Sequence, residues 1–291
     1  DGWSSEPSAE HFELRRKGEE QVITFQLIPG KKSTNGTIRW VAETPEGEYS
    51  QSEKEIEYDH IPVQPVLNES TVEAVSFSLE TAGTRTGYLE GSGDDVPTAL
   101  RRMGYEVELL ATEDISSRDL SVFDAIITGI RSYNVLDGLV GVNHRLKDYV
   151  HGGGNVIVQY NVTYGLLVED IGPYSFQISR DRVTDETAEP TFLNKKHPIL
   201  NYPNKLGKSD FDGWVQERGL YFADEWGEAF TPLISWSDSG EDPVKGGLIV
   251  AEHGKGTFTY TGISFFRQLP AGVPGAYRLM ANLIAGGRDG R

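Results

Sequence analysis

Polar and aromatic side chains follow the predicted strands at three places in the middle of the chain. Segments 91–95, 129–134 and 160–163 each come directly after a short apolar run that we interpret as a strand. In open sheets of parallel strands, ligands bind beyond the carboxyl ends of the strands, where the strand order reverses. We therefore expect these three segments to form the rim of any binding site.

Two later stretches, 179–186 and 209–218, are rich in both charged and aromatic residues, which is typical of functional loops. We expect the second stretch to line the same crevice. Aromatic rings there could stack on a sugar, although such rings are more often buried in a core. Arginines could bind a ligand or pair with nearby carboxylates to order the loops. The candidate ligand-binding residues are Asp94, Arg131, Tyr133, Asn134, Tyr160, Asn161, Asp212, Trp214, Gln216, Glu217 and Arg218.

Several kinds of chemistry are disfavoured by what the sequence lacks. It has no cysteine, so thiolate metal sites and a cysteine nucleophile are excluded. The six histidines lie apart without a zinc-binding motif, and the alternating Asp210 and Asp212 lack the further oxygen ligands of a calcium loop. We expect no metal, no cofactor and no catalytic residue. Whether the chain is an enzyme stays open, with a non-catalytic role favoured.

A hydrolase acting on sugar or amide substrates is the alternative. Such an enzyme would use two carboxylates at the rim, chosen from Asp94, Asp212 and Glu217. Glycoside chemistry requires the pair to lie about 5 to 10 Å apart. The sequence supplies no such distance.

The elements that must position the rim alternate in a regular way. Strands are predicted at 84–90, 105–110, 123–128 and 155–159, and helices at about 95–103 and 136–150. A hairpin at 247–262 and a final helix at 274–285 follow. Short strands alternating with helices, with glycines at the turns, indicate a parallel-rich sheet covered by helices. The predicted class is therefore α/β, with a flavodoxin-like domain.

The first 70 residues have a different pattern. Half-polar alternating segments are separated by turn residues, and no helical period appears. This pattern predicts a small antiparallel β-sandwich of immunoglobulin-like type over residues 1–70. Pro62, Pro65 and Asn68 would form the linker to an α/β domain at 71–291.

The α/β part resembles the class I glutamine amidotransferase-like fold, especially its trehalose-utilisation-protein-like branch. The motifs that carry this resemblance are FDAIITG (123–129), the glycine run 152–154 before a strand, and GKGTFTYTG (254–262). The resemblance implies a cysteine just after the strand at 155–159, but Tyr160, Asn161 and Val162 stand there. Neither Tyr nor Asn can form the thioester that glutamine hydrolysis needs. The resemblance therefore implies the architecture without the activity.

A second resemblance extends over nearly the whole chain. The sequence is similar to the C-terminal region of large bacterial PIG-L (LmbE-like) deacetylases. Its motifs are YDHIP (58–62), GSGD (91–94), QISRDRVT (177–184), WVQERG (214–219) and SFFRQLPAG (264–272). Those proteins carry a zinc-dependent N-acetylglucosamine deacetylase domain, whose metal motif this sequence lacks. The resemblance implies an accessory module, part of a longer protein, that binds a glycan or docks the catalytic domain.

Charge and hydropathy limit the partners. The net charge of −17 makes nucleic acid an unlikely ligand, because phosphate backbones require clustered Lys and Arg. No apolar run reaches the length of a membrane span. The expected partners are the catalytic deacetylase domain and a glycan. Export to the periplasm or cell exterior would suit a cysteine-free chain, while a cytoplasmic location stays open.

Overall fold

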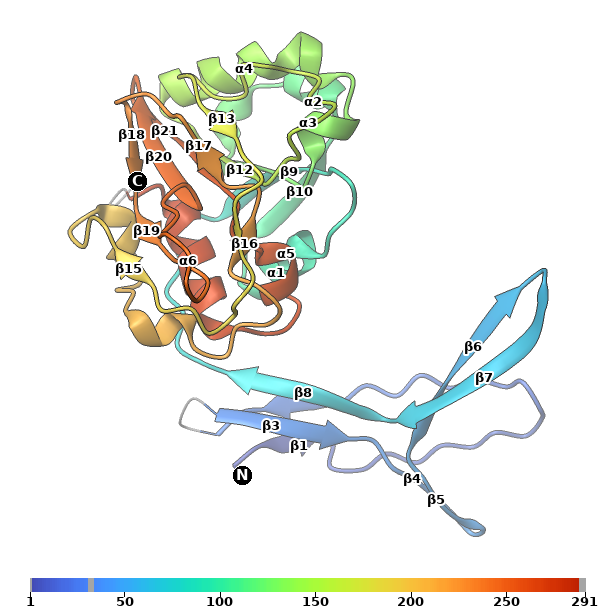
Figure 1. Ribbon diagram of the computed structural model, residues 1–291. Coiled ribbons are helices and arrows are strands. Elements are labelled where there is room, and N and C mark those ends of the chain that lie inside the picture. Colours follow the sequence, from blue (N-terminus) through green and yellow to red (C-terminus); the bar gives the residue numbers. More distant parts are fainter. Residues whose placement is uncertain (1, 31–33, 288–291) are drawn as a thin grey trace. The chain divides into compact units, whose positions relative to one another are not determined.

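The computed structural model describes residues 2–30 and 34–287 and divides the chain into two compact units, Asp1–Ser78 and Leu79–Arg291 (Figure 1). The first unit consists of strands and loops, and the second contains the helices and the large sheet. Within the described residues, no helix combines the length and apolarity that crossing a bilayer requires.

The strands of the first unit pair only two by two. The antiparallel ladders are β1 (Ser4–Glu6) with β2 (Gln26–Ile28), β3 (Thr34–Arg39) with β8 (Thr71–Ser76), β4 (Ala42–Thr44) with β5 (Gly47–Tyr49), and β6 (Gln51–Tyr58) with β7 (Ile61–Glu69). Among the side chains described in this unit, only Ala74 is buried, whereas Val22 and Leu67 are exposed. The expected β-sandwich, which needs two packed sheets around a core, is not confirmed.

The expected linker at 62–68 is wrong. Pro62, Pro65 and Asn68 lie within β7, and β8 beyond them pairs with β3. Prolines are tolerated there because a two-stranded ladder has a free edge, so the missing N–H of each proline need not break a hydrogen bond.

The second unit is built on one seven-stranded sheet with the order β10-β9-β11-β12-β21-β20-β18. The strands are β9 (Arg85–Leu89), β10 (Glu106–Leu110), β11 (Ala125–Thr128), β12 (Asn155–Gln159), β18 (Phe230–Pro232), β20 (Leu248–His253) and β21 (Gly256–Thr261). The first five strands in this order are parallel to one another. β20 is antiparallel to β21, and β18 is antiparallel to β20. In chain order the parallel strands lie 2-1-3-4-5, which is the flavodoxin-like order. The predicted α/β class with a parallel-rich sheet is confirmed.

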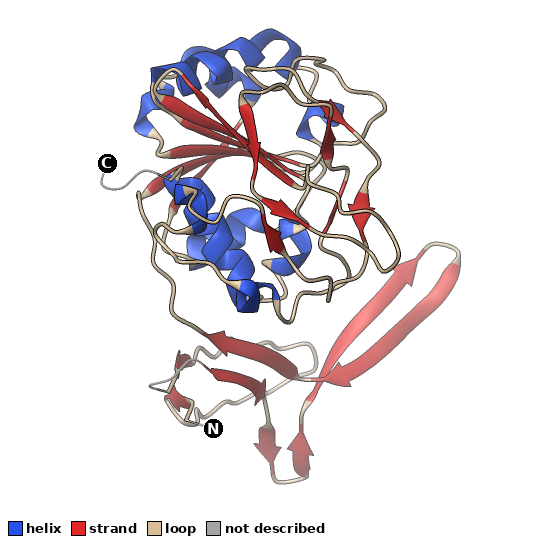
Figure 2. Cartoon of the chain, turned by 60° about the vertical axis from the view of Figure 1, so that its left-hand side comes forward, coloured by secondary structure: helices blue, strands red, loops and turns tan. Residues whose placement is uncertain are grey.

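Helices cover both faces of this sheet (Figures 1 and 2). The helices are α1 (Val96–Arg102), α2 (Thr112–Ser117), α3 (Ser132–Val135), α4 (Leu139–Gly152), α5 (Phe265–Gln268) and α6 (Pro274–Ala285). Helices α4 and α6 both contact β12. Because both faces are covered, every residue of β11 and β12 is buried, as continuous apolar strands require.

Short elements fill the long segment between β12 and β20. Three two-residue ladders pair β13 (Gln177–Ile178) with β17 (Ala223–Asp224), β14 (Arg182–Val183) with β16 (Gly219–Leu220), and β15 (Thr191–Phe192) with β19 (Ile234–Ser235). Turns of 3₁₀ helix lie at Leu120–Val122, Pro198–Leu200 and Lys208–Phe211. The β14–β16 ladder matters most, because beside it the Arg218 amide donates to the Val183 carbonyl at 2.9 Å and so joins the two charged and aromatic stretches that the sequence singles out.

The loops after β9 and β11 meet at the point where the strand order reverses. The amide of Ser92 donates to the carbonyl of Ile130 at 2.9 Å. Gly91 lies so close to this loop that a Cβ atom there would be 2.0 Å from the Ile130 oxygen. This position therefore requires glycine for close backbone approach.

We predict that Gly91→Ala destabilises the protein by about 2 kcal/mol or more, because the added methyl group forces the two loops apart. The free energy of unfolding from urea denaturation would measure this loss. Gly141→Ala is the matched control, since Gly141 lies within α4 with open space at its Cβ position. That substitution should stabilise by up to about 1 kcal/mol through helix propensity. Equal stability of Gly91→Ala and wild type would contradict the close approach.

Candidate functional site

Asp94 holds the loops at the switch point together. Its carboxylate accepts hydrogen bonds from the Tyr88 hydroxyl at 2.6 Å and from the amides of Val96 and Ile130, both at 3.1 Å. The Tyr88 hydroxyl in turn accepts from Gln159 Nε2 at 2.9 Å. Both Asp94 oxygens are therefore used within the protein, and its role is to position the loops.

Tyr133, Asn134 and Asn161 form a second set of loop clamps. The Tyr133 side chain is fully buried, and its hydroxyl donates to Asn143 Oδ1 at 2.8 Å. The Tyr133 amide donates to Asn161 Oδ1 at 2.9 Å, and Asn134 Oδ1 accepts from the Val162 amide at 2.9 Å. These side chains fix the loop after β12 against α3. Both Tyr133 and Asn161 are buried and bonded within the protein, so their predicted contact with a ligand stays a prediction.

Trp214 and Arg218 belong to a buried cluster of their own. Trp214 is 3% exposed and Arg218 is 2% exposed, so neither offers a surface to a sugar. Arg218 donates to the carbonyls of Ala188 and Phe211, and its guanidinium lies 5.2 Å from the Trp214 ring centroid. Trp214 thus follows the alternative of a ring buried in a core. A bulky ring is more stable inside the core once its N–H has a partner, here the Asp210 carbonyl at 2.9 Å.

Burial lowers the pKa of Arg218 to about 10, and the nearby Asp185, Asp212 and Glu186 oppose this decrease. Asp212 itself is exposed and acts on Arg218 by charge. Its predicted place in a ligand crevice stays a prediction.

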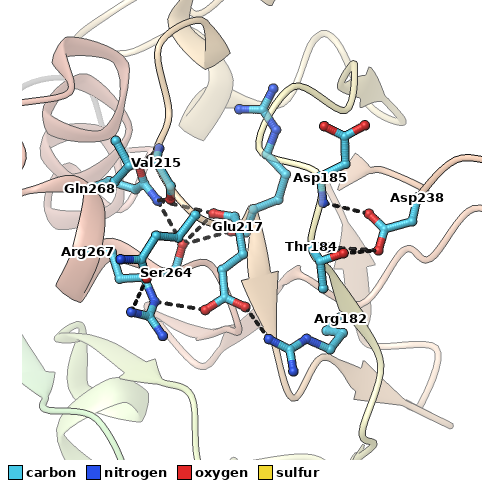
Figure 3. A network of polar contacts seen from close by, with 11 residues as sticks. Arg182, Thr184, Asp185, Val215, Glu217, Asp238, Ser264, Arg267 and Gln268 are labelled. Atoms are coloured by element: carbon cyan, nitrogen blue, oxygen red, sulfur yellow. Dashed lines mark hydrogen bonds and ion pairs between the residues drawn. The ribbon is translucent and has the colours of Figure 1, made fainter.

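Glu217 occupies the centre of a polar network near the rim (Figure 3). Its side chain is 3% exposed, and its two oxygens accept from Arg182 Nη2 at 2.7 Å and Arg267 Nε at 2.9 Å. Its carbonyl oxygen accepts from Ser264 Oγ and Gln268 Nε2. Arg267 also donates to the Gln216 side chain. Both carboxylate oxygens thus face arginines, which leaves neither aimed at a substrate.

An aromatic surface lies next to this network. Tyr160 stacks on Tyr221 with ring centroids 5.9 Å apart and planes 9° apart, and it contacts Phe266 at 5.3 Å. The Arg267 guanidinium covers the Phe266 ring at 4.8 Å. Burial raises the pKa of the Tyr160 hydroxyl; Arg131 and Arg267 oppose this increase, whereas Glu217 and Tyr221 add to it. Those four side chains are therefore near the Tyr160 hydroxyl.

We call this assembly the rim cluster. It consists of Arg131, Tyr160, Arg182, Gln216, Glu217, Tyr221, Phe266 and Arg267. Arg131, Gln216 and Tyr221 have φ angles of 58°, 66° and 51°, in the left-handed region that non-glycine residues rarely adopt. Such strain concentrates at functional sites.

The rim cluster contains only part of the predicted site. Arg131, Tyr160, Gln216 and Glu217 come together, whereas Asp94, Tyr133, Asn134 and Asn161 hold the loops and Asp212, Trp214 and Arg218 lie elsewhere. Sequence reasoning missed Arg182, Tyr221, Phe266 and Arg267 as site residues. Arg182, Phe266 and Arg267 lie within motifs that carry the PIG-L resemblance, and that signal could have selected them.

A cavity of about 410 Å³ lies away from the rim. It is lined by Asp119, Phe123, Arg145, Tyr149 and the glycines 152–154, next to the amino ends of β11 and β12. We place the site at the rim because ligands of such sheets bind at the carboxyl ends, and because strain, aromatics and charge meet there. Within the described ranges, no group of three or more His, Asp or Glu side chains could hold a metal ion.

We predict that Glu217→Gln lowers the free energy of unfolding by about 1 to 3 kcal/mol at neutral pH. The substitution removes the buried negative charge that both arginines contact. The expected loss of stability stays moderate because Arg182 and Arg267 are partly exposed and water can solvate them. Urea denaturation would measure it. Glu189→Gln breaks an ion pair with Lys208 on the exposed surface and should leave the free energy of unfolding unchanged. Equal behaviour of the two variants would contradict the network.

Comparisons with known proteins identify no family. No family model matches the chain, and no curated protein matches it. Solved structures with a similar arrangement include PurLQS from Thermotoga maritima, at 13% identity and a TM-score of 0.46 over 69% of this chain and 98% of that one. A protein from Thermoplasma acidophilum that resembles a GMP synthase component has 10% identity and a TM-score of 0.46 over 72% and 96%.

A ThuA-like protein from Bacteroides uniformis has 12% identity and a TM-score of 0.42 over 71% of this chain and 92% of that one. With TM-scores below 0.5, these likenesses carry no argument about activity. The sheet itself, with its parallel strands in the order 2-1-3-4-5, fits an amidotransferase-like α/β architecture.

Proposed function

We propose that the α/β unit is a non-catalytic module that binds a saccharide at the rim cluster. The observation that carries the proposal is the stacked surface of Tyr160, Tyr221 and Phe266 at the carboxyl ends of the parallel strands. Tyr221 and Phe266 are partly exposed, so their rings offer apolar faces to a sugar. Gln216 and Arg267, which belong to the same cluster, supply hydrogen-bond donors for hydroxyl groups.

The polar groups of the rim support binding without catalysis. The loop after β12 carries no cysteine, and the carboxylates of Asp94 and Glu217 are bonded within the protein. The alternative hydrolase, which would work through two rim carboxylates, needs carboxylates that reach the substrate as acid and base. The amidotransferase-like domain is thus proposed to be degenerate, with its strand ends reused for recognition.

We further propose that this module accompanies a PIG-L-type N-acetylglucosamine deacetylase domain in an exported bacterial protein. The support is the set of motifs at 177–184, 214–219 and 264–272, since these segments supply Arg182, Gln216, Glu217, Phe266 and Arg267 to the rim cluster. A deacetylase of amino sugars would gain from a second surface that retains the glycan near its active site, because linked sites raise the effective concentration.

We predict that N-acetylglucosamine or chitotriose raises the melting temperature of the protein in a dose-dependent manner, because a ligand that binds only the folded state stabilises it. Phe266→Ala should weaken the affinity by roughly 3- to 10-fold through the lost ring contact. Tyr49→Ala, which removes an exposed ring in the first unit, is the control and should change nothing. Absence of any saccharide effect, or an unchanged affinity in Phe266→Ala, would count against the binding module.

The docking part of the proposal has a separate test. Titration of this protein with the catalytic domain of a bacterial PIG-L deacetylase, followed by calorimetry, should give saturable heat of binding. Interfaces between domains of one protein resemble transient complexes, so micromolar protein concentrations or higher are required. Heat that does not exceed a lysozyme control would exclude docking while leaving saccharide binding intact.

A further inference from the structure

Arg131 differs from the other arginines of the rim cluster. Arg182 and Arg267 both pair with Glu217, whereas Arg131 has no carboxylate or hydrogen-bond partner for its side chain within residues 2–30 and 34–287. Its Nε atom is buried and unpaired. A buried guanidinium N–H without a partner lowers the stability of the folded protein. A ligand that accepts a hydrogen bond from this N–H could offset that loss.

The backbone holds Arg131 in a fixed place. Its amide donates to the Tyr160 carbonyl at 2.8 Å, and its left-handed conformation lies between the end of β11 and the start of α3. The guanidinium acts by charge on the Tyr160 hydroxyl, which lies beside Tyr221 and Phe266. Arg131 therefore belongs beside the aromatic surface proposed to bind a saccharide.

The local charge of the rim cluster is opposite to that of the chain. The cluster contains three arginines, Arg131, Arg182 and Arg267, and one carboxylate, Glu217, while the adjacent Asp238 also interacts by charge with Arg182. Counting both carboxylates leaves three minus two, or one, positive charge. The whole chain carries −17. The carboxylate of the nearby Asp94 accepts hydrogen bonds from Tyr88, Val96 and Ile130, so it does not pair with these arginines. A positive site on an acidic protein selects anions.

Other buried polar atoms lack partners at the same end of the sheet. Ser132 Oγ, at the start of α3, is fully buried and unpaired, and so is Thr128 Oγ1 at the end of β11. Serine and threonine hydroxyls can donate to an anion. These two hydroxyls are therefore further donors near Arg131 that are not used within the described protein.

We propose that the rim cluster binds an acidic saccharide, whose carboxylate or phosphate is held by Arg131 while the sugar ring contacts Tyr221 and Phe266. This inference rests on the proposed saccharide-binding function and adds the charge of the ligand. A guanidinium presents parallel N–H groups that match the oxygens of a carboxylate or phosphate. The hydroxyl oxygens of a neutral sugar can also accept from Arg131, but they lack the charge that makes such a hydrogen bond strong.

The test is calorimetric titration of the whole chain, at low ionic strength, with glucuronate, glucose 6-phosphate and glucose. At least one acidic sugar should bind about tenfold or more tighter than glucose, since hydrogen bonds to charged groups are the stronger ones. The advantage should shrink as salt is raised. Comparison of glucuronate with glucose 6-phosphate identifies the anionic group.

Variants separate Arg131 from general charge effects. Arg131→Gln should bring the acidic sugar to the affinity of glucose, and Arg131→Lys should retain part of the preference. Arg101→Gln, in the last turn of α1 at the far end of the strands, is the charge-matched control and should retain all of it. The melting temperature of each variant reports folding; if Arg131→Gln does not fold, the comparison of Arg131→Lys with wild type decides.

The outcomes distinguish this inference from the proposed function. Equal affinities for glucose and both acidic sugars would overturn the anionic preference and leave saccharide binding standing. A preference that survives Arg131→Gln would also overturn the inference. If none of the three sugars binds, the anionic preference fails, and the thermal-shift measurement with N-acetylglucosamine and chitotriose decides the saccharide site. If acetate and phosphate match the acidic sugars and Phe266→Ala has no effect, the anion site stands and the saccharide proposal fails.

Discussion

The buried carboxylate of Glu217 is the constraint on which the rim depends. An ionised carboxylate inside a protein is tolerated only when charged donors replace the lost water, and Arg182 and Arg267 supply that replacement. One arginine comes from β14 and the other from α5, so a single side chain fixes the ends of two distant segments. The ring of Phe266 is held in turn because the Arg267 guanidinium covers it. The aromatic surface is thus ordered by electrostatics as much as by packing.

Much of the α/β architecture could be predicted from local sequence. The strand at Asn155–Gln159 and the helix at Pro274–Ala285 have the predicted bounds, because a buried apolar run and an amphipathic period are strong signals bounded by glycines. The first unit could not be predicted as well. Alternating half-polar segments indicate strands but do not say how many pair, and here they pair only two by two.

The candidate site was harder to predict because residue type does not reveal burial. Trp214 and Tyr221 are both aromatic residues in the same segment, yet one packs beneath Arg218 and the other reaches the rim. The difference arises from pairings between segments far apart in the sequence, such as Arg182 with Leu220. The loop glycines were easier to interpret, since Gly91 has a purely steric reason to be there.

The sparse pairing of the first unit has a thermodynamic consequence. Unfolding increases the heat capacity mainly by exposing apolar surface to water. In the described part of this unit only Ala74 is buried, so its unfolding exposes little new apolar surface. The heat-capacity increment of the whole chain therefore belongs almost entirely to the α/β unit. If the measured heat-capacity increment is divided by all 291 residues, the value per residue is accordingly too low for the α/β unit, which contains the core.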